Sequence, residues 1–327
     1  MVGASVCDPL APFALRVGKT YFWSSAGDAV LAYQMRLGTA VVSGDPVGDR
    51  EQFAALAAQF VAFTAGRGWR VAVLGAGEQM RAMWLAHGLG SLSIGRDVVL
   101  PVDTFTMQGR RFRNLRQAVQ RSHNAGVTVS FHAEARVDRH LAAGLLALRD
   151  RGHKRGDRGF SMLMGNLLDG THPDSLIGVA HDRAGQPVAF QRYLRSGPDG
   201  LSLDLPVRDP AAPNGVDERL IVDVAGWGKQ HGVGWVSLAF APFADVYAAP
   251  RHTLAGSVGY YALHLFDPLI RVGSLYRYLS KFHAVAGQRF VMLRWRQVVP
   301  VVAAMLLLEF QSTPNSPAGD HRDGAHR

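Results

Sequence analysis

The pattern of apolar and polar positions in the first third of the chain predicts strands that alternate with helices. Val30–Val42 has the pattern of two strands, separated by a polar break at residues 36–38. Arg50–Arg67 has apolar residues three and four positions apart, as on one face of a helix. The pattern continues with a buried strand at Trp69–Leu74, a short helix at Gln79–His87, and strands at Leu89–Ile94 and Asp97–Val102. These elements indicate a compact α/β domain at residues 15–106.

A second and longer α/β unit begins near Met107. The predicted elements are a helix at Phe112–Asn124, a strand at Val127–His132, a helix at Val137–Arg151, strands at Leu176–His181, Pro187–Arg195 and Gly200–Val207, a helix at Gly215–His231, a strand at Gly234–Phe240, a helix at Gly273–His283 and a strand at Gln288–Trp295. This is the element order of GNAT-type acyltransferases, and the first unit has a shorter version of it. We therefore predict two GNAT-like folds in tandem, with mixed sheets flanked by helices and the second domain at residues 107–297.

The chain ends with an apolar segment and a polar tail. Val298–Leu308 is the longest apolar run, about half the length of roughly 20 residues that a membrane-spanning helix needs. Two interpretations stay open for residues 298–311: a helix packed in the core, or a segment that lies on a membrane surface. Residues 312–327 are polar and rich in Pro, Gly and Ser, which predicts disorder.

Composition and charge narrow the class of protein. Hydrophobic residues make up 48% of the chain, as in globular proteins, and the formal net charge is +9. A basic surface attracts phosphate groups, either of RNA or of anionic lipid. Cys7 is the single cysteine, which excludes an internal disulfide and a cysteine-rich metal site and fits a cytoplasmic location. The N-terminus lacks the pattern of a signal peptide.

Two basic segments are candidates for binding phosphate groups of RNA. The candidate residues are Arg110, Arg111, Arg113 and Arg116 on the predicted helix, and Arg151, Lys154 and Arg155 in a glycine-rich stretch. The planar fork of arginine binds phosphate oxygens through two hydrogen bonds, which favours a phosphate clamp. A solvated helix face remains the alternative interpretation of the first segment.

Asp204, Lys281 and Arg289 are the candidate catalytic residues. Asp204 shares one face of its strand with Ser202, and a carboxylate there could orient a base or hold a substrate ammonium group. Lys281 and Arg289 flank a predicted helix–strand junction, where cationic groups could stabilise the negative charge of acyl transfer. Structural roles stay open for all three: an aspartate satisfied by backbone amides, and a cationic pair at the surface.

Candidate substrate-binding residues lie in the neighbouring elements. Asn214, Gly215 and Asp217 occupy the turn from a strand into a helix, and Ser237 lies in the next strand. Free backbone amides at the start of a helix can bind an anion. However, GNAT enzymes that use acetyl-CoA wrap its pyrophosphate with an Arg/Gln-x-x-Gly-x-Gly/Ala turn at this junction. The corresponding sequence, DPAAPNGVDERLI, has no such turn, which argues against coenzyme A.

Other reaction classes lack their sequence signals. The histidines show no HExxH or similar ligand spacing, so we expect no metal site. The chain also lacks a Gly-x-Ser-x-Gly nucleophile elbow and a P-loop, which disfavours a serine hydrolase and an NTPase.

A series of sequence blocks resembles one bacterial family. In chain order the blocks are SGDPVGD, VLGAGE, RNLRQAV followed by NAGVTV, RGFSM, GLSLDL, NGVDE, VSLAFAPF, and SLYRYLSKF with QRFV. From about Thr20 to Arg294, they resemble the C-terminal aminoacyltransferase domain of phosphatidylglycerol lysyltransferases, also called multiple peptide resistance factors, and especially the actinobacterial branch. The resemblance places the family's Asp-Leu-Met-Arg aspartate at Asp204, its Lys-Phe lysine at Lys281 and its Arg-Tyr arginine at Arg289.

The resemblance implies a function as well as a fold. It implies transfer of an amino acid from aminoacyl-tRNA to the hydroxyl of a membrane lipid, phosphatidylglycerol or a related glycerolipid, without a cofactor because the ester is already activated. It also implies resistance to antimicrobial peptides. We expect a cytoplasmic protein, with peripheral binding to the inner face of the plasma membrane as one possibility. The alternatives are a GNAT-like N-acyltransferase that uses a thioester, and a non-catalytic relative that binds RNA or membrane.

The chain departs from the family pattern next to Asp204. The family's Met-Arg is here Pro206-Val207, so its arginine is replaced. Arg208, one position later, is expected on the opposite face of the strand unless Pro206 reshapes that strand.

Overall fold

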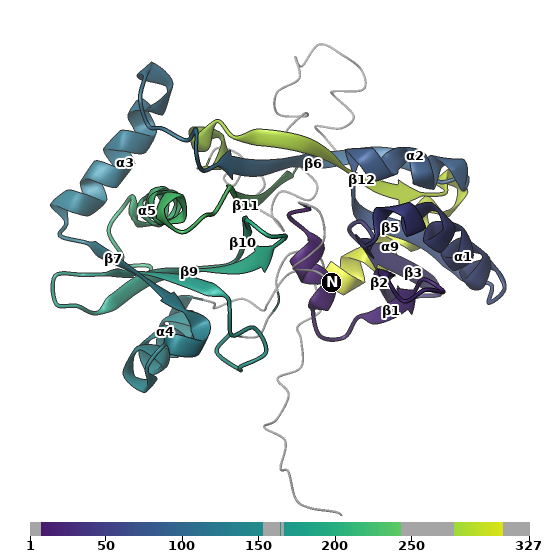
Figure 1. The fold of residues 1–327 in the computed structure, drawn as a ribbon, viewed down its shortest axis with the longest axis horizontal. Helices are drawn as coiled ribbons and strands as arrows, with labels where there is room; N and C mark the ends of the chain where they lie inside the picture. The colour runs from purple at the N-terminus through teal and green to yellow at the C-terminus, as the bar shows by residue number, and fades with distance from the viewer. Residues whose placement is uncertain (1–7, 153–163, 165–166, 243–277, 310–327) are drawn as a thin grey trace, which may run out of the picture.

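A computed structural model of the chain describes residues 8–152, 164, 167–242 and 278–309. Within these residues, a mixed sheet of 12 strands runs through the whole molecule (Figure 1). Its strands follow the order β1-β2-β3-β5-β12-β6-β11-β10-β9-β8-β7, and the short β4 pairs with β2.

The first half of the sheet contains strands from the first third of the chain. Its elements are η1 (Ala11–Leu15), β1 (Thr20–Trp23), β2 (Ala29–Arg36), β3 (Thr39–Ser43), β4 (Val47–Gly48), η2 (Arg50–Gln52), α1 (Phe53–Ala65), β5 (Arg70–Gly77), α2 (Glu78–Ala86) and β6 (Gly90–Pro101). The predicted alternation of strands and helices is confirmed. The two strands predicted at Leu89–Ile94 and Asp97–Val102 are wrong, because they form the single strand β6. The polar residues near Gly95 are accommodated by a register shift against the neighbouring strand rather than by a turn.

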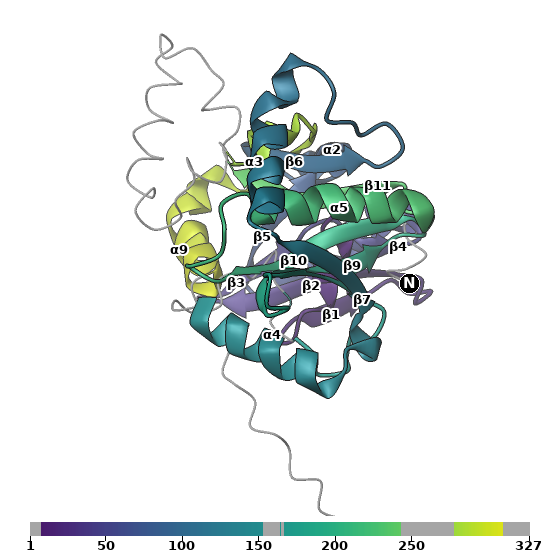
Figure 2. The same cartoon turned by 90° about the vertical axis from the view of Figure 1, so that its left-hand side faces the viewer.

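The second half follows the predicted order of elements. Its elements are η3 (Arg110–Phe112), α3 (Arg113–Asn124), β7 (Thr128–Ala133), η4 (Glu134–Arg136), α4 (Arg139–Gly152), β8 (Leu176–His181), β9 (Pro187–Ser196), β10 (Gly200–Arg208), α5 (Val216–Gln230) and β11 (Trp235–Pro242). In this half, α3 and α5 lie side by side over one face of the sheet, and α4 covers the other (Figure 2). The two apolar cores include Leu115 and Ile221 on the α3–α5 side, and Leu145 and Leu148 on the α4 side.

The last strand of the chain lies inside the sheet. β12 (Val285–Leu293) pairs antiparallel with β5 on one side and with β6 on the other. In the sequence, β12 falls within the predicted second domain. In the sheet, it pairs with strands that precede residue 102. The division at residues 106 and 107 stays a prediction. Of the helix predicted at Gly273–His283, the described part contains η5 (Ser280–Phe282), and residues 273–277 lie outside the described residues.

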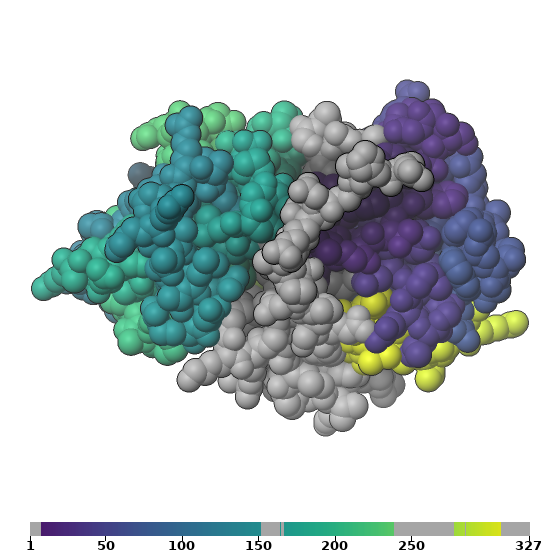
Figure 3. Space-filling view, turned by 90° about the horizontal axis from the view of Figure 1, so that it is seen from below, coloured from purple at the N-terminus to yellow at the C-terminus, as the bar shows by residue number. Residues whose placement is uncertain are grey.

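The apolar segment near the C-terminus forms α9 (Val298–Glu309), which follows η6 (Trp295–Gln297). Val301, Ala304 and Leu308 pack against the sheet, on the face opposite α1. The interpretation of this segment as a core helix is therefore confirmed for the side of α9 that faces the sheet. Figure 3 shows the yellow α9 beside the purple first half, with the teal second half on the other side of the molecule. The tail predicted at residues 312–327 lies outside the described residues.

The N-terminal segment 8–15 connects the two halves of the sheet. Ser196 and Ser202, on β9 and β10, donate hydrogen bonds of 2.8 Å each to the carbonyl oxygens of Asp8 and Pro9. On its other side, η1 packs its alanines against apolar residues of β2 and β4. The segment therefore contributes contacts to both halves.

Candidate functional site

The candidate site lies where β10 ends and α5 begins. Gly215 precedes the first residue of α5 with φ of +94°, a conformation that favours glycine. A Cβ atom at this position would lie 1.9 Å from the carbonyl oxygen of Ala118 on α3. The sequence Asn214-Gly215 therefore allows α3 and α5 to approach closely, and this approach forms one wall of a cavity.

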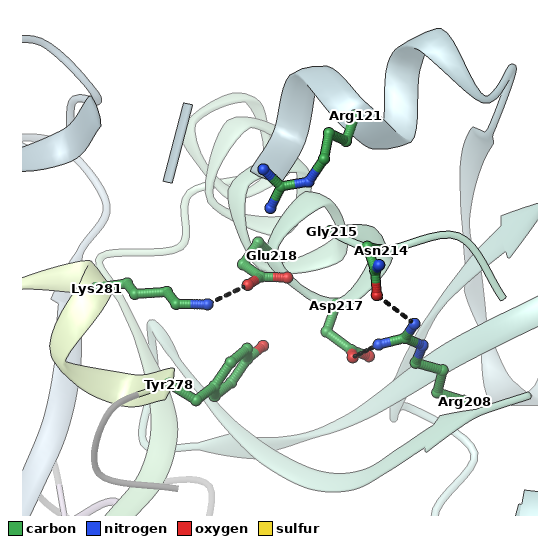
Figure 4. Close-up of a pocket in the computed structure, with 8 residues that line it drawn as sticks. All are labelled: Arg121, Arg208, Asn214, Gly215, Asp217, Glu218, Tyr278 and Lys281. Carbon is green, nitrogen blue, oxygen red and sulfur yellow. Dashed lines mark hydrogen bonds and ion pairs between the residues drawn. The ribbon is translucent and has the colours of Figure 1, made fainter. Parts of the chain in front are cut away.

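The cavity has a volume of about 330 Å³. Its lining residues are Arg121, Arg208, Asn214, Gly215, Asp217, Glu218, Tyr278 and Lys281 (Figure 4). They come from α3, the end of β10, the turn before α5 and its first turn, and η5 with the residues just before it. The lining carries three cationic and two anionic side chains, so the cavity favours a ligand with a negatively charged group.

Two ion pairs cross the cavity. Lys281 Nζ lies 2.7 Å from Glu218 Oε1, and Arg208 Nη1 lies 3.6 Å from Asp217 Oδ2. Arg208 also donates to Asn214 Oδ1 at 3.3 Å (Figure 4). Burial raises the pKa of Asp217, and the charge of Glu218 raises it further, whereas Arg208 opposes this shift. Burial, together with both carboxylates, also holds the pKa of Tyr278 well above its usual value.

A β-bulge explains how Arg208 reaches the cavity. The pairing of β10 with β9 shifts register between Leu203 and Leu205, so one extra residue, Asp204, enters β10. Val207 consequently packs in the core beside α4, while Arg208 faces the start of α5. The guanidinium group of Arg208 lies beside Asn214. In the sequence, Arg208 is one position later than the arginine of the family pattern.

Asp204 lies in a buried ionic cluster away from the cavity lining. One carboxylate oxygen accepts from the backbone N–H of Met164 at 2.8 Å, and the other accepts from Arg192 Nη1 at 2.9 Å. Arg192 Nε donates to Glu134 at 2.6 Å, and Glu134 accepts from the N–H of Leu168 at 2.7 Å. The three charged side chains are nearly inaccessible to solvent, and they tie strands β9 and β10 to the backbone of Met164 and Leu168.

Arg289 lies in a second buried cluster, in the first half of the sheet. Its guanidinium donates to Asp97 at 2.8 Å, to the carbonyl oxygen of Gly75 at 3.1 Å and to Asp8, and it lies 3.8 Å from Asp45. Three carboxyls therefore surround one cation. Burial is the largest cause that raises the pKa of Asp45 to about 7 and that of Asp97 to about 6, and the charge of Asp8 adds to both shifts.

The structure therefore separates the three candidate catalytic residues. Lys281 lines the cavity, whereas Asp204 and Arg289 each belong to a different buried cluster. The candidate substrate-binding residues Asn214, Gly215 and Asp217 share the cavity with Lys281. Ser237 is buried in β11, opposite Ser202 of β10, and does not line this cavity. The roles of these residues in a reaction stay predictions.

The predicted phosphate-binding residues differ in exposure and in the hydrogen bonds and ion pairs that their side chains already form. Arg110, Arg111 and Arg113 are exposed at the start of α3. Arg116 donates to the carbonyl oxygens of residues 107 and 109 and thus holds the turn before α3. Arg151 forms an exposed ion pair of 3.3 Å with an aspartate after β10. The predicted residues Lys154 and Arg155 lie outside the described residues.

Four residues of the cavity were not selected from the sequence: Arg121, Arg208, Glu218 and Tyr278. Arg121 belongs to the basic helix, Arg208 ends β10, Glu218 follows Gly215 in the first turn of α5, and Tyr278 precedes Lys281 by three positions. Helical spacing could have selected Tyr278 beside Lys281. The approach of α3 to α5, which brings Arg121 to the cavity, has no signal in the local sequence.

The described residues contain no group of three or more His, Cys, Asp or Glu residues that could hold a metal ion. None of the helices in these ranges has the length and apolar character to cross a bilayer.

Comparison with solved structures shows a shared fold. The structure of L-PGS from Bacillus licheniformis matches with a TM-score of 0.75 and 22% identity over 93% of this chain and 92% of that chain. A C-terminal domain (DUF2156) from Agrobacterium fabrum matches with a TM-score of 0.76 and 19% identity over 94% of this chain. The predicted fold class, a GNAT-like α/β fold with a mixed sheet flanked by helices, is confirmed.

Comparison with named proteins shows longer relatives. An MprF-like domain protein of Mycobacterium tuberculosis is 44% identical over 95% of this chain and 66% of its own length. The lysylphosphatidylglycerol biosynthesis bifunctional protein LysX of Rhodococcus jostii is 34% identical over 77% of this chain and 23% of its own length. The chain thus spans less than two thirds of either relative. The family model described as "Phosphatidylglycerol lysyltransferase, C-terminal" matches residues 3–293, which confirms the resemblance seen in the sequence blocks. The chain belongs to the family of phosphatidylglycerol lysyltransferase C-terminal domains.

Proposed function

We propose that this chain transfers an aminoacyl group from aminoacyl-tRNA to a hydroxyl group of phosphatidylglycerol or a related glycerolipid. The observation that carries the proposal is the cavity at the start of α5, in a chain of this family. Lys281 and Arg208 face this cavity together with two carboxylates. The name of the LysX relatives, lysylphosphatidylglycerol biosynthesis proteins, agrees with a lipid product.

The chemistry of the cavity suits transfer from an ester. The ester of an aminoacyl-tRNA is already activated, so the protein has to place the acceptor hydroxyl against the carbonyl carbon and to stabilise the oxyanion that forms. The ammonium group of Lys281 and the guanidinium group of Arg208 are cationic groups available for the oxyanion. Backbone amides in the first turn of α5 add positive potential at the same place.

The position of α3 supports an RNA donor. Arg121 of this helix lines the cavity, and Arg110, Arg111 and Arg113 are exposed at its other end. Guanidinium groups therefore lie at both ends of the helix, and one of them is at the cavity. Phosphates of an RNA strand can bind these groups while the 3′ end enters the cavity.

The exposed side of α9 supports peripheral binding to a membrane. Val299 of α9 is 76% exposed, Val302 and Leu307 are further exposed apolar residues of this helix, and Trp295 of the preceding η6 is 57% exposed. The neighbouring Arg294 and Arg296 are also exposed. Apolar and aromatic side chains next to arginines are typical of segments that lie on an anionic lipid surface.

Transfer can be measured with purified protein, tRNA charged with a pool of labelled amino acids, and vesicles of phosphatidylglycerol and phosphatidylethanolamine. We expect label in a lipid, and we expect RNase treatment of the tRNA to abolish it. Label that comes from an acyl thioester without tRNA would instead support an N-acyltransferase. Binding of tRNA or vesicles without any labelled lipid would support a non-catalytic relative.

A further inference from the structure

The first turn of α5 places two consecutive carboxylates at one cavity, and their environments differ. Glu218 is 2.7 Å from Lys281, and its side chain is 9% exposed. Asp217 is 3.6 Å from Arg208, and its side chain is 24% exposed. Figure 4 shows Glu218 directed toward Lys281 and Asp217 directed toward Arg208. Of the two, Asp217 has the looser ion pair and the carboxylate that is more open to a ligand.

The acidic groups of the two buried clusters described above do not meet the geometric requirement for proton transfer at this cavity. A general base has to lie within hydrogen-bond reach of the proton that it accepts. Both oxygens of Asp204 accept hydrogen bonds inside a closed cluster, and Asp45 and Asp97 surround Arg289 in the first half of the sheet. Among the described residues that line the cavity, the acids are Asp217 and Glu218, and none is a histidine.

We propose that Asp217 is the general base of the transfer, which accepts the proton of the acceptor hydroxyl. This inference rests on the proposed function. As the proton moves to Asp217, the hydroxyl oxygen forms a bond to the ester carbonyl carbon, and the carbonyl oxygen becomes an oxyanion next to the cationic groups of the cavity. The bond between that carbon and the ribose oxygen then breaks, and the proton passes from Asp217 to the ribose oxygen. No oxidant, reductant or further co-reactant is needed.

The surroundings of Asp217 suit a group that gains and loses a proton. Burial and the charge of Glu218 raise its pKa, which strengthens the carboxylate as a proton acceptor. The charge of Arg208 limits the rise of this pKa, and the ion pair with Arg208 holds the carboxylate in its orientation. Arg208 is in turn held by hydrogen bonds to the carbonyl oxygen of Ala212 at 2.8 Å and to Asn214. Arg208 is thus a positioning residue for Asp217.

The test compares Asp217→Asn, Asp217→Glu and the matched control Asp223→Asn. Asp223 lies on the same helix in an ion pair of 2.5 Å with Arg219, outside the cavity lining. We expect Asp217→Asn to lower kcat by about 10²–10⁴ with KM within about threefold of the wild type. Asp217→Glu should recover part of kcat, and Asp223→Asn should match the wild type. The fall of kcat at acidic pH should be present in the wild type and in Asp217→Glu and absent in Asp217→Asn.

Three outcomes would overturn the assignment. A rise in KM at unchanged kcat would show that Asp217 binds a substrate ammonium group. An equal loss in Asp223→Asn, or a loss that follows the thermal stability of each variant, would show a structural role.

A titration without substrate separates this proposal from the proposed function. The carboxyl carbon of Asp217, assigned by comparison of NMR spectra of the wild type and Asp217→Asn, should titrate above the usual value of about 3.9. A titration at the usual value overturns the general-base assignment even when the protein is active. Absence of transfer by the wild type refutes the proposed function, and the titration still reports on Asp217.

Discussion

Lys281 and Glu218 form an ion pair of 2.7 Å between residues 63 positions apart in the chain. The pair joins η5 to the first turn of α5 across the cavity. Lys281 Nζ also lies 5.6 Å from the ring centre of Tyr278, within the range of a cation–π contact. The ammonium group is therefore held in place before any substrate enters, as electrostatic stabilisation of an oxyanion requires.

Removal of the ammonium group should impair transfer more than folding. We expect Lys281→Ala to lower the transfer rate by about 10², as loss of one oxyanion donor does. Lys281→Arg keeps the charge and should retain more activity. The rate is measured with labelled aminoacyl-tRNA, and thermal unfolding of each variant is the control. A wild-type rate in Lys281→Ala would exclude the lysine from the mechanism.

Asp204 should prove essential for stability. Its loss leaves Arg192 paired with Glu134 but removes the acceptor of Arg192 Nη1 and of the Met164 N–H, and each buried donor left unsatisfied costs about 1–3 kcal/mol. We expect Asp204→Ala to lower the free energy of unfolding in urea by at least about that amount. Because Glu134 belongs to the same cluster, Asp204→Ala and Glu134→Ala should be non-additive. A loss of activity at unchanged stability would instead support the catalytic role predicted from the sequence.

The cluster around Arg289 should make stability depend on pH. Folding raises the pKa of Asp45 from 3.8 to about 7 and that of Asp97 from 3.8 to about 6, so the folded chain binds protons more tightly than the unfolded chain. This stabilisation is complete below about pH 4 and is lost as the pH rises through 6 and 7.

Asp45→Asn tests this dependence, because asparagine can still accept the 2.9 Å hydrogen bond from the N–H of Gly77. We expect the variant to lose less unfolding free energy than the wild type between pH 5 and pH 8. The matched control Asp174→Asn, at an exposed aspartate, should follow the wild type. Equal pH dependence in Asp45→Asn and the wild type would contradict the shift at Asp45.

Gly215→Ala should disturb both the fold and the cavity. The added Cβ atom would meet the carbonyl oxygen of Ala118 at 1.9 Å, and the backbone φ of +94° is itself unfavourable for alanine. We expect a loss of unfolding free energy of about 1–3 kcal/mol and weaker substrate binding, because α3 has to move away from α5. Gly226→Ala, on the same helix with open space around the position, is the control.

Vesicle binding should depend on the exposed side of α9. Burial of one valine-sized side chain in an apolar environment contributes about 1.5–3 kcal/mol. We therefore expect Val299→Asp to weaken binding to anionic vesicles by about tenfold or more in a sedimentation assay. Leu85→Asp, at an exposed leucine of α2 on the other face of the sheet, should bind as the wild type does. Equal binding of both variants would remove α9 from the membrane contact.

The sequence predicted what depends on local periodicity. The helix at Arg50–Arg67, the three strands between residues 176 and 207 and the turn at Asn214-Gly215 all have regular spacing or turn chemistry, and they appear in the structure. Motif order also selected Lys281 and Asn214 for one site, and both line the cavity.

Partners distant in the chain could not be predicted from the same patterns. Asp97 and Gly75 are 192 and 214 positions from Arg289, so no local spacing reports these contacts. The β-bulge at Asp204 could not be predicted either. A prediction from alternating residues assumes that the two strands pair without an extra residue, and it therefore places Arg208 on the wrong face of β10. An arginine in a family motif looks the same in sequence whether it binds a substrate or neutralises buried carboxylates.

The place of β12 in the sheet has a consequence for synthesis of the protein. The strand that fills the gap between β5 and β6 is residues 285–293, about 190 residues after β6. A growing chain on the ribosome therefore exposes the facing edges of β5 and β6 until residues 285–293 have been made. We expect closure of the sheet to be a late and slow step set by these long-range pairings.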